Sequence, residues 1–428
     1  MISMVKLIYL VIDGAADRIQ DAPTSLELAK TPGLDKLAKL SIGGLMYTIG
    51  PGIAPESDSA VLSILGYDPH TYYTGRGPLE ALGVGIRIKE NYEVAFRANF
   101  ATIDPSDLRI IDRRVKRSLT SKEALELAKA LDNLDLGKYD GYARVIATIG
   151  HRAVVIIGSK SHKLSDMVEN TDPAYMKRGK ISVSVKRYKP YIVMPKPLDN
   201  SNEAKITAEL VSIFTKKSIE ILDNHPINVE RLKKGLLKAN AILLRDAGNT
   251  LPKVKPINEL FKMKFGAIAE MPVEVGIARL LGMKVIERPP LSNKKEDYRI
   301  RLSETLKLLS EVDVVYVHLK GPDEPAHDGN QEEKVKAIEL IDKYFVQPLI
   351  KNIDLTNVCI LVTSDHATPP KIKTHTDDPV PFILAWRKIK PDGIQRFTEI
   401  ECKEKGSLGI IEHGHELLPK IFRILHRD

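Results

Sequence analysis

Aspartate and histidine residues cluster beside four apolar segments of the sequence, three times after the segment and once before it. These residues are Asp13, Asp323, His327, Asp365, His366 and His375. Mixed carboxylate and imidazole ligands suit Zn²⁺ or Mn²⁺, and carboxylates alone suit Mg²⁺. Charged groups at the ends of buried strands are costly unless they are paired or bound to a metal. The residue types and their positions therefore predict a site for divalent metal ions.

Each of these motifs also has a purely structural interpretation. Asp13 with Gly14 is compatible with a plain turn, and Asp323 with the cap of a helix. The whole set is more specific than any part, because its members fall at the same end of the predicted strands. His413 and His415 have a ligand-like spacing, but they precede the last predicted helix and we interpret them as surface residues.

A nucleophile can be sought in the segment ESDSAVLSIL, which places Ser57 and Ser59 at the start of a predicted helix. A helix N-terminus favours a phosphate group and an alkoxide. Two metal ions a few ångströms apart activate a nucleophile and neutralise charge during phosphoryl transfer. An activated serine can attack phosphorus and become a phosphoserine. The alternative is that both serines only cap the helix.

The elements that must position these residues alternate between strand and helix. An apolar strand is predicted at residues 5–12, and helices at 31–40 and 56–65. After residue 226 the alternation covers strands and helices at residues 239–244, 273–281, 283–286, 298–309, 312–319, 332–350, 358–363, 380–385 and 416–425. This order predicts an α/β fold with a mostly parallel sheet and helices on both faces. No helix precedes the strand near residue 382, so we expect that edge to be mixed.

The segment from residue 86 to 225 differs in texture, with long polar loops between strand-like runs and one amphipathic helix at 122–131. We interpret it as a smaller inserted α/β domain, and residues 1–85 with 226–428 as the core that holds the metal site. A chain of 428 residues is long enough for this division.

Composition excludes several classes of protein. No apolar run approaches 18 residues, so no membrane-spanning helix is predicted, and the N-terminus lacks the layout of a signal peptide. We therefore expect a cytoplasmic protein. The net charge is +8, but the basic residues are spread along the chain without interleaved aromatics, which argues against a nucleic-acid-binding protein. Cys359 and Cys402 are too few for a disulfide framework, and Cys359 reads as a buried small hydrophobe. Scarce glutamine with plentiful lysine and glutamate fits a heat-adapted source.

Six motifs extend these inferences by resemblance. LVIDGAAD, ESDSAVLSILGYDP, TGRGPLEALGVGI, KGPDEPAHDG, TSDHATPP and THTDDPVPF together resemble the archaeal-type cofactor-independent phosphoglycerate mutases of the alkaline phosphatase superfamily. The resemblance implies an alkaline-phosphatase-like core and an inserted domain. It also implies interconversion of 3-phosphoglycerate and 2-phosphoglycerate through a phosphoserine, without 2,3-bisphosphoglycerate. Two divalent metal ions would be needed, with Mn²⁺, Mg²⁺, Zn²⁺ and Co²⁺ all compatible.

The resemblance also assigns the ligands. One metal would bind Asp323, His327 and His375, and the other would bind Asp13, Asp365, His366 and the nucleophile Ser57. By motif match Ser57 is preferred to Ser59. Two departures lie nearby, because Glu56 stands where glycine is common and Val61 where histidine is common. Asp166 and Asp172 fall in a looser version of a family segment, so their roles stay open.

A mutase must hold a small phosphorylated acid and exclude water, so the insertion should act as a lid with basic residues. The candidates that would bind substrate are Arg113, Arg114, His151, Arg152, Arg245 and Lys320. The alternative for each is an ordinary solvated charge. A phosphatase with the same metals, and a basic nucleic-acid-binding protein, are the competing functions. The oligomeric state, including a homo-oligomer, is left open.

Overall fold

The computed structural model of the protein describes residues 5–178, 181–185 and 187–425. Its internal contacts divide the chain into two compact units. Unit 1 comprises Met1–Tyr72 and Val254–Asp428, and unit 2 comprises Tyr73–Lys253. Unit 2 contains the expected insertion, but it begins before residue 86 and ends after residue 225.

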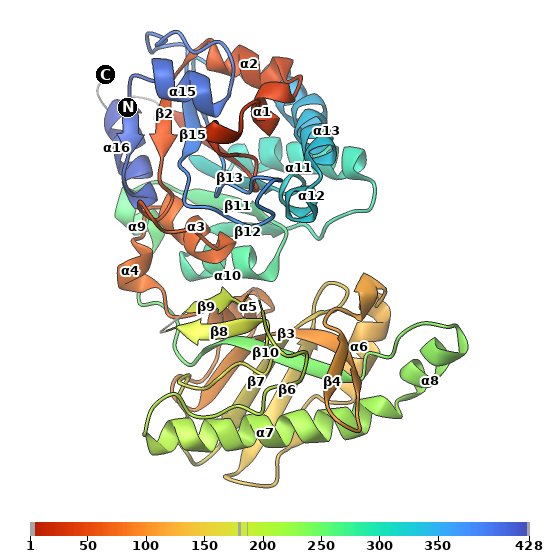
Figure 1. Ribbon diagram of the computed structural model, residues 1–428. Coiled ribbons are helices and arrows are strands. Elements are labelled where there is room, and N and C mark those ends of the chain that lie inside the picture. The colour runs from red at the N-terminus through yellow and green to blue at the C-terminus, as the bar shows by residue number, and fades with distance from the viewer. Residues whose placement is uncertain (1–4, 179–180, 186, 426–428) are drawn as a thin grey trace. The chain divides into compact units, whose positions relative to one another are not determined.

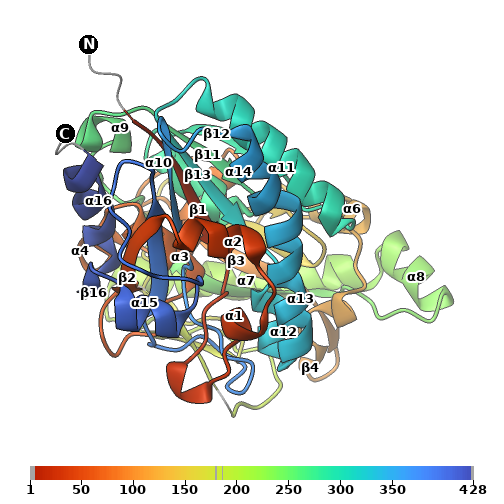
Figure 2. The same cartoon turned by 90° about the horizontal axis from the view of Figure 1, so that it is seen from above.

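Unit 1 is built on an eight-stranded sheet in the order β12-β11-β13-β1-β14-β15-β2-β16 (Figures 1 and 2). All its strand pairs are parallel except the two made by β15, which runs against β14 and β2. The mostly parallel sheet and its mixed edge are therefore confirmed. The strands are β1 (Lys6–Ile12), β2 (Ser41–Met46), β11 (Phe265–Ala269), β12 (Lys284–Glu287), β13 (Val314–Leu319), β14 (Val358–Thr363), β15 (Val380–Ala385) and β16 (Gly409–Ile411).

Helices cover both faces of this sheet (Figure 2). Successive side chains of β1 point to opposite faces of the sheet. Ile8 and Leu10 belong to a core cluster that includes residues of helices α2, α11, α13 and α14. On the other face, the Tyr9 hydroxyl donates to the Ile64 carbonyl of α3. The helices of unit 1 are α1 (Ser25–Leu28), α2 (Pro32–Ala38), α3 (Ser57–Ile64), α4 (Pro69–Tyr72), α9 (Ile257–Phe261), α10 (Pro272–Leu280), α11 (Lys294–Leu309), α12 (Asp323–Asp328), α13 (Gln331–Ile341), α14 (Gln347–Asn352), α15 (Glu399–Lys405) and α16 (Leu417–Leu425). A π-helical turn, Asp342–Val346, joins α13 to α14, which together form the predicted long helix.

Unit 2 is built on a second sheet, in the order β10-β3-β7-β6-β5 with β4 added to β3, and its strand pairs are antiparallel. Its strands are β3 (Glu93–Asp104), β4 (Arg109–Asp112), β5 (Leu134–Asp135), β6 (Gly141–Ala147), β7 (Arg152–Ser159) and β10 (Ala241–Gly248), with a separate hairpin of β8 (Tyr175–Arg178) and β9 (Ile181–Ser184). Its helices are α5 (Arg76–Gly83), α6 (Ser121–Lys129), α7 (Asn202–Asp223) and α8 (Pro226–Lys233).

The strand expected at residues 239–244 was assigned to the metal-binding core, and this assignment is corrected by the structure. That strand is β10, which pairs along its length with β3 of unit 2, so that Leu243 lies opposite Asn99. The packing of Gly77, in α5, explains why unit 2 also begins before the predicted residue 86. Gly77 lies so close to the backbone of Ala95 and Asp246 that no side chain fits between them. The helix α5 is thereby seated on this sheet.

No helix in the described part of the chain is both long and apolar enough to cross a membrane. Cys359 and Cys402 are free and buried, which confirms the interpretation of Cys359 as a small hydrophobe.

Candidate active site

Strand register brings the predicted ligands of unit 1 to one edge of the sheet. Ile12 at the end of β1 lies opposite Leu319 at the end of β13, and Val11 lies opposite Thr363 at the end of β14. The loops that follow these three neighbouring strands therefore start at the same level. They carry Asp13, Asp323, Asp365 and His366, as expected for the carboxyl edge of a parallel sheet.

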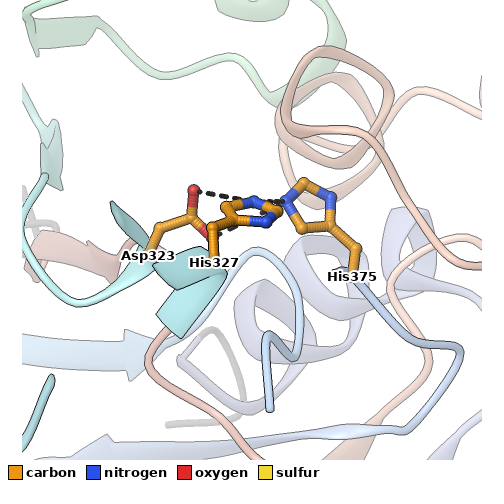
Figure 3. Close-up of side chains that lie close together, drawn as sticks. All are labelled: Asp323, His327 and His375. Atoms are coloured by element: carbon orange, nitrogen blue, oxygen red, sulfur yellow. Dashed lines mark hydrogen bonds and ion pairs between the residues drawn. The ribbon is translucent and has the colours of Figure 1, made fainter. Parts of the chain in front are cut away.

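The first ligand set consists of Asp323 and His327 on α12 and His375 on the loop before β15 (Figure 3). The two Nε2 atoms of the histidines are 3.1 Å apart, and each lies near the Asp323 carboxylate, at 3.4 Å from Oδ2 for His327 and 3.6 Å from Oδ1 for His375. Backbone carbonyls accept from both Nδ1 atoms, namely Lys373 for His327 and Pro55 for His375. Because carbonyls only accept, Nδ1 of each ring is a donor, and the two Nε2 atoms face each other and the Asp323 carboxylate. A shared proton or a metal cation can occupy that position, so both Nε2 atoms are available as metal ligands.

The second ligand set contains Asp13, Asp365, His366 and Ser57. Asp365 Oδ1 accepts from the backbone N–H groups of Gly14 and His366, at 3.0 and 3.1 Å, whereas Oδ2 has no hydrogen-bond partner. His366 Nε2 lies 3.2 Å from Asp365 Oδ2, 3.6 Å from Asp13 Oδ1 and 3.3 Å from Ser57 Oγ. One oxygen of Asp365 is thus fixed by the backbone and the other is left for a ligand.

Thr368 links the two sets. Its hydroxyl donates to Asp323 Oδ1 at 2.8 Å and therefore accepts from Nδ1 of His366 at 2.9 Å. Nε2 of His366 is thereby directed toward Asp13, Asp365 and Ser57. The imidazole of His366 also stacks on that of His375 with their centroids 3.8 Å apart. The two sets are therefore neighbours, as the sequence predicted.

Gly14 is required where β1 passes the first set. Its φ is +58°, and a Cβ atom there would lie 2.7 Å from Asp323 Oδ1 and 2.9 Å from the Thr368 hydroxyl. The Asp-Gly pair is therefore more than a plain turn, since only glycine lets the backbone approach the ligand.

The two candidate serines differ in their contacts. Ser57 is the first residue of α3, and its Oγ faces His366 Nε2. Ser59 Oγ instead donates to the carbonyl of Glu56 at 3.0 Å, which is a local cap contact. The contacts favour Ser57 over Ser59.

Two residues that the sequence reasoning missed lie against the second set. His318, in β13, is completely buried with Nε2 3.3 Å from Asp365 Oδ2, and Glu274, in the first turn of α10, lies 3.3 Å from its Nδ1. A histidine inside the otherwise apolar strand VVYVHL was the signal that could have identified it. The expected substrate residue Lys320 contacts Asp13 Oδ1 at 3.0 Å and Glu274 Oε1 at 2.7 Å.

Charges at this edge stabilise one another. Burial raises the pKa of Asp13, but Lys320, His318 and His366 outweigh it and hold that pKa well below its usual range. Burial and repulsion from Asp13 raise the pKa of Asp323, and hydrogen bonds from His327 and His375 bring it well below normal. Both carboxyl groups are therefore ionised at neutral pH and available as ligands.

The donor atoms fit divalent metal ions. Three buried atoms of the second set have no hydrogen-bond partner and lie within 4.8 Å of one another, namely Asp13 Oδ1, Asp365 Oδ2 and His318 Nε2. The donor atoms of the first set also lie within 4.8 Å of one another. Unpartnered buried carboxylate oxygens are costly, and a bound cation removes the cost. Asp and His donors accept Mn²⁺, Zn²⁺, Co²⁺ or Mg²⁺, and the residues do not choose among them.

Unit 2 holds a cluster of arginines around Tyr175. Arg245 lies opposite Arg97 in the β10–β3 pair, and its guanidinium lies 3.8 Å from the Tyr175 ring. Arg245 Nε and Nη1 are buried without hydrogen-bond partners. Burial and repulsion from Arg245 and Arg76 lower the pKa of Arg97 to about 9. Arg97 and Arg76 were not predicted, although an arginine inside the strand VAFRANF is a readable signal.

The other predicted basic residues of unit 2 differ in their state. Arg113 makes a two-pronged ion pair with Asp172, 2.9 Å from Nε to Oδ1, so part of its charge is already compensated. Burial and the neighbouring Arg113 lower the pKa of Arg114, partly offset by Tyr175. Burial, Arg152 and Arg114 lower the pKa of His151 to about 3. His151 is therefore neutral and not the cation that we expected. It would contact an anion only through a hydrogen bond.

Asp166, whose role the sequence left open, lies 3.6 Å from the buried Lys177 ammonium. His413 and His415 are half-buried rather than surface residues, since their rings stack 5.6 Å apart and His413 Nδ1 donates to the Ile49 carbonyl.

An α/β sheet whose carboxyl edge carries two aspartate–histidine sets beside a helix N-terminal serine is typical of metal-dependent phosphoryl-transfer enzymes. Comparison with known proteins identifies the family. A family model described as 2,3-bisphosphoglycerate-independent phosphoglycerate mutase matches residues 38–228. The mutase of that name from Aeropyrum pernix is 47% identical over 425 residues, which cover 98% of this chain and 99% of the relative. A second, from Archaeoglobus fulgidus, is 40% identical over 96% of both chains.

Solved structures agree with this assignment. The cofactor-independent phosphoglycerate mutase from Thermoplasma acidophilum is 32% identical with a TM-score of 0.62, over 98% of this chain and 100% of its own. The PH0037 protein from Pyrococcus horikoshii is 28% identical with a TM-score of 0.78, over 100% and 99% of the two chains. This chain belongs to the family of 2,3-bisphosphoglycerate-independent phosphoglycerate mutases, which confirms the resemblance of the six motifs.

Proposed function

We propose that the chain interconverts 3-phosphoglycerate and 2-phosphoglycerate through a phosphoserine at Ser57, without 2,3-bisphosphoglycerate. The observation that carries the proposal is the position of Ser57 Oγ, at the first residue of α3 and 3.3 Å from His366 Nε2. A helix N-terminus stabilises negative charge there, both on the alkoxide and on the phosphate it receives. The names of the relatives give the substrate class.

We further propose that each ligand set holds one divalent ion. Asp323, His327 and His375 would bind one, and Asp13, Asp365, His366 and Ser57 would bind the other. Ions bound there would neutralise the phosphate charge and lower the pKa of the Ser57 hydroxyl. The buried Oδ2 of Asp365, which has no hydrogen-bond partner, and the facing Nε2 atoms of the first set support this assignment.

The proposed reaction exchanges one phosphoester for another. Ser57 Oγ attacks the phosphorus of 3-phosphoglycerate, an Oγ–P bond forms, and the bond between phosphorus and the C3 oxygen breaks. The C3 oxygen takes up the proton that Ser57 gives up. The C2 hydroxyl of the retained glycerate then attacks the phosphoserine, a bond between the C2 oxygen and phosphorus forms, the Oγ–P bond breaks, and the C2 hydroxyl gives its own proton to Ser57 Oγ. No water and no second phosphate are consumed, so exclusion of water decides between mutase and phosphatase.

The carboxylate of the substrate requires positive charge, and we propose that the arginine cluster of unit 2 supplies it. Arg245, Arg97 and Arg76 repel one another in a buried environment, which lowers the pKa of Arg97. Arg245 Nε lies 3.6 Å from Asp246 Oδ2, and the buried Nη1 without a hydrogen-bond partner supports an anion as a further partner. Arg114 and Arg152 are proposed to belong to the same binding surface, with His151 as a neutral donor or acceptor. In unit 1, Lys320 is proposed to contact the phosphate rather than the carboxylate.

A phosphate-fate assay tests the proposed function. The protein, loaded with Mn²⁺, is incubated with 3-phosphoglycerate alone, and 2-phosphoglycerate and free phosphate are followed together. We expect 2-phosphoglycerate with little free phosphate, and loss of turnover on chelation. Phosphate release at the rate of isomerisation would instead identify a phosphatase.

The nucleophile is tested by Ser57→Ala with Ser59→Ala as the matched control. Ser57→Ala should lower kcat by at least about 10³-fold, because the step has no other nucleophile. It should keep the Mn²⁺ ion of the first set, since Ser57 lies outside it. Ser59→Ala should keep kcat within a few-fold, because its hydroxyl only contacts Glu56. Full activity of Ser57→Ala would reject the assignment.

A further inference from the structure

His318 is buried in the strand next to β1, and its Nε2 points at the second ligand set. Nε2 lies 3.3 Å from Asp365 Oδ2 and 3.7 Å from Asp13 Oδ1, yet all three atoms are without a hydrogen-bond partner. A protonated Nε2 at these distances would donate to one of the two oxygens. The three atoms instead surround a common point, as metal ligands do.

The other side of the imidazole has the partners of a metal-ligating histidine. Nδ1 faces Glu274 Oε1 and the Tyr316 hydroxyl, both at 3.3 Å. A carboxylate beside Nδ1 favours the proton on that atom and leaves Nε2 with its lone pair. An acceptor on Nδ1, with Nε2 directed toward the carboxylate of a ligand set, occurs likewise at His327, His366 and His375.

The charges around His318 can be balanced by a divalent cation. Asp13, Asp365 and Glu274 are buried carboxylates, and Lys320 contacts two of them. With the imidazoles neutral, three negative charges and one positive charge leave a net charge of −2, which one divalent ion compensates. Lys320 contacts Asp13 Oδ1, the oxygen that also lies 3.7 Å from His318 Nε2, so the ammonium and the ion would share that oxygen.

We propose that His318 Nε2 is a ligand of the divalent ion held by Asp13 and Asp365, and that Glu274 positions its imidazole. The proposal rests on the proposed function only in that it takes this set to hold an ion. The competing role for His318 is an imidazolium that bridges Asp13 and Asp365 by hydrogen bonds. That role would place a proton between Nε2 and the two carboxylates, where the proposal places the ion, and no hydrogen bond of regular geometry joins these atoms.

Paramagnetic proton NMR of the Co²⁺-loaded full-length protein tests the assignment without a variant. A histidine that binds Co²⁺ through Nε2 gives a strongly shifted, exchangeable Nδ1–H signal. We expect four such signals, from His318, His327, His366 and His375. His318→Gln should remove one of the four and leave the remaining three. Three signals in the unmodified protein, all retained in His318→Gln, would overturn the proposal.

Metal affinity gives a second readout. Titration with Mn²⁺ should resolve two binding events, and His318→Ala should weaken one of them by at least about 100-fold while leaving the other within a few-fold. Glu274→Gln should weaken the same event by about 10–100-fold, as expected for a partner of a ligand. Imidazole added to His318→Ala should restore part of the lost affinity. His413→Ala is the matched control, since it removes a half-buried histidine outside both sets, and it should change neither event.

These readouts separate the inference from the proposed function. Four shifted signals with no isomerisation in the phosphate-fate assay would keep the ligand and reject the mutase reaction. Isomerisation with three signals and unchanged Mn²⁺ affinity in His318→Ala would keep the reaction and reject the ligand.

Discussion

The histidines at the sheet edge depend on a single hydroxyl for their orientation. Thr368 accepts from His366 Nδ1 and donates to Asp323 Oδ1, so one side chain contacts a ligand of each set. It is buried and bears no charge of its own. Its role is therefore to position ligands rather than to bind the ion.

Replacing Thr368 by valine should weaken both ions at nearly constant shape. The isosteric side chain leaves Nδ1 of His366 without its acceptor and Asp323 Oδ1 without its donor, so we expect Mn²⁺ affinity to fall by about 10–100-fold. Titration with Mn²⁺ measures the change. Thr368→Ser keeps the hydroxyl and should retain affinity within a few-fold. Equal affinity in the valine and threonine proteins would show that Thr368 positions neither ligand.

Among elements, the turn Val115–Arg117 in unit 2 has an uncommon backbone. Its three residues have φ values of 53°, 49° and 54°, in the left-handed region that costs about 1–2 kcal/mol for each non-glycine residue. Asp112 Oδ1 holds the turn by accepting from the backbone N–H groups of Arg114 and Lys116, both at 2.8 Å, and Val115 is completely buried. The turn borders a cavity of about 560 Å³ lined partly by Arg113, Arg114, Lys116 and Arg117. Strain of this kind is commonly kept at binding sites.

The exposed residue Lys116 allows the strain to be measured. Lys116→Gly removes the left-handed penalty, which offsets the added flexibility of glycine in the unfolded chain, so unit 2 should gain about 0–1 kcal/mol. Lys129→Gly is the matched control, because Lys129 ends α6 with helical backbone, and the same substitution there should cost about 1 kcal/mol. Urea unfolding measures both. A loss of similar size in the two variants would show that the turn is not strained.

Asp112→Ala tests what holds the turn. Loss of two backbone hydrogen bonds should destabilise unit 2 by about 1–3 kcal/mol, and Lys116→Gly should recover part of the loss. Chemical denaturation of the single and double variants gives the comparison. If Asp112→Ala has no effect, burial of Val115 alone maintains the turn.

Sequence patterns predicted the elements of unit 1 better than those of unit 2. The run at residues 5–12 and the run at 358–363 are buried on both faces, so continuous apolar stretches were sufficient to identify β1 and β14. The long helix α7 was missed although Ile206, Leu210 and Phe214 have helical spacing. The pairing of β10 with β3 was also missed, because it joins residues far apart in the chain and no local pattern encodes it.

The candidate site shows the same limit. Asp13, Asp323, Asp365 and His366 could be predicted because each lies within four residues of the end of a strand, and the position of a strand end is local information. His318 and Arg97 could not be selected in this way, since they lie inside strands. Their possible roles depend on which charged residues the neighbouring strands place beside them. The pKa of His151 is lowered first by burial and then by the adjacent Arg152 and by Arg114, and because burial depends on the tertiary fold, the sequence alone did not indicate the neutral state.

At the scale of the whole molecule, a buried carboxyl outside the active site makes stability depend on pH. Glu399, at the start of α15, accepts from the Asp17 N–H and the Thr24 hydroxyl, both at 2.8 Å. Burial, together with the Asp17 carboxylate, raises the pKa of Glu399 to about 7. Between pH 4.5 and 7 the folded protein therefore holds a proton that the unfolded chain releases. The free energy of unfolding should fall through that range, by up to about 3 kcal/mol, and level off above it.

Glu399→Gln should remove this dependence, because the amide stays neutral at every pH. Urea unfolding at pH 5 and pH 8, with chelator present throughout, compares the two proteins. The variant should be the more stable one at pH 8. Glu404→Gln, an exposed change on the same helix, is the control and should follow the unmodified protein. A pH profile of Glu399→Gln identical to that of the unmodified protein would mean that the carboxyl is ionised in the folded state.

Metal removal should act on one unit and not on the other. Every residue of the two ligand sets lies in unit 1. An ion present at 100 times its dissociation constant stabilises the state that binds it by about 2.7 kcal/mol, and this gain belongs to the unit that supplies the ligands. Chelation without substrate should therefore speed hydrogen exchange of the amides in β1, β13 and β14, and leave β3 and β7 unchanged. Exchange measured by mass spectrometry on peptides from these strands tests it, with return of Mn²⁺ as the control for reversibility. Equal acceleration in β3 and β7 would show that unit 2 contributes ligands to the ions, which would contradict the assignment of both sets to unit 1.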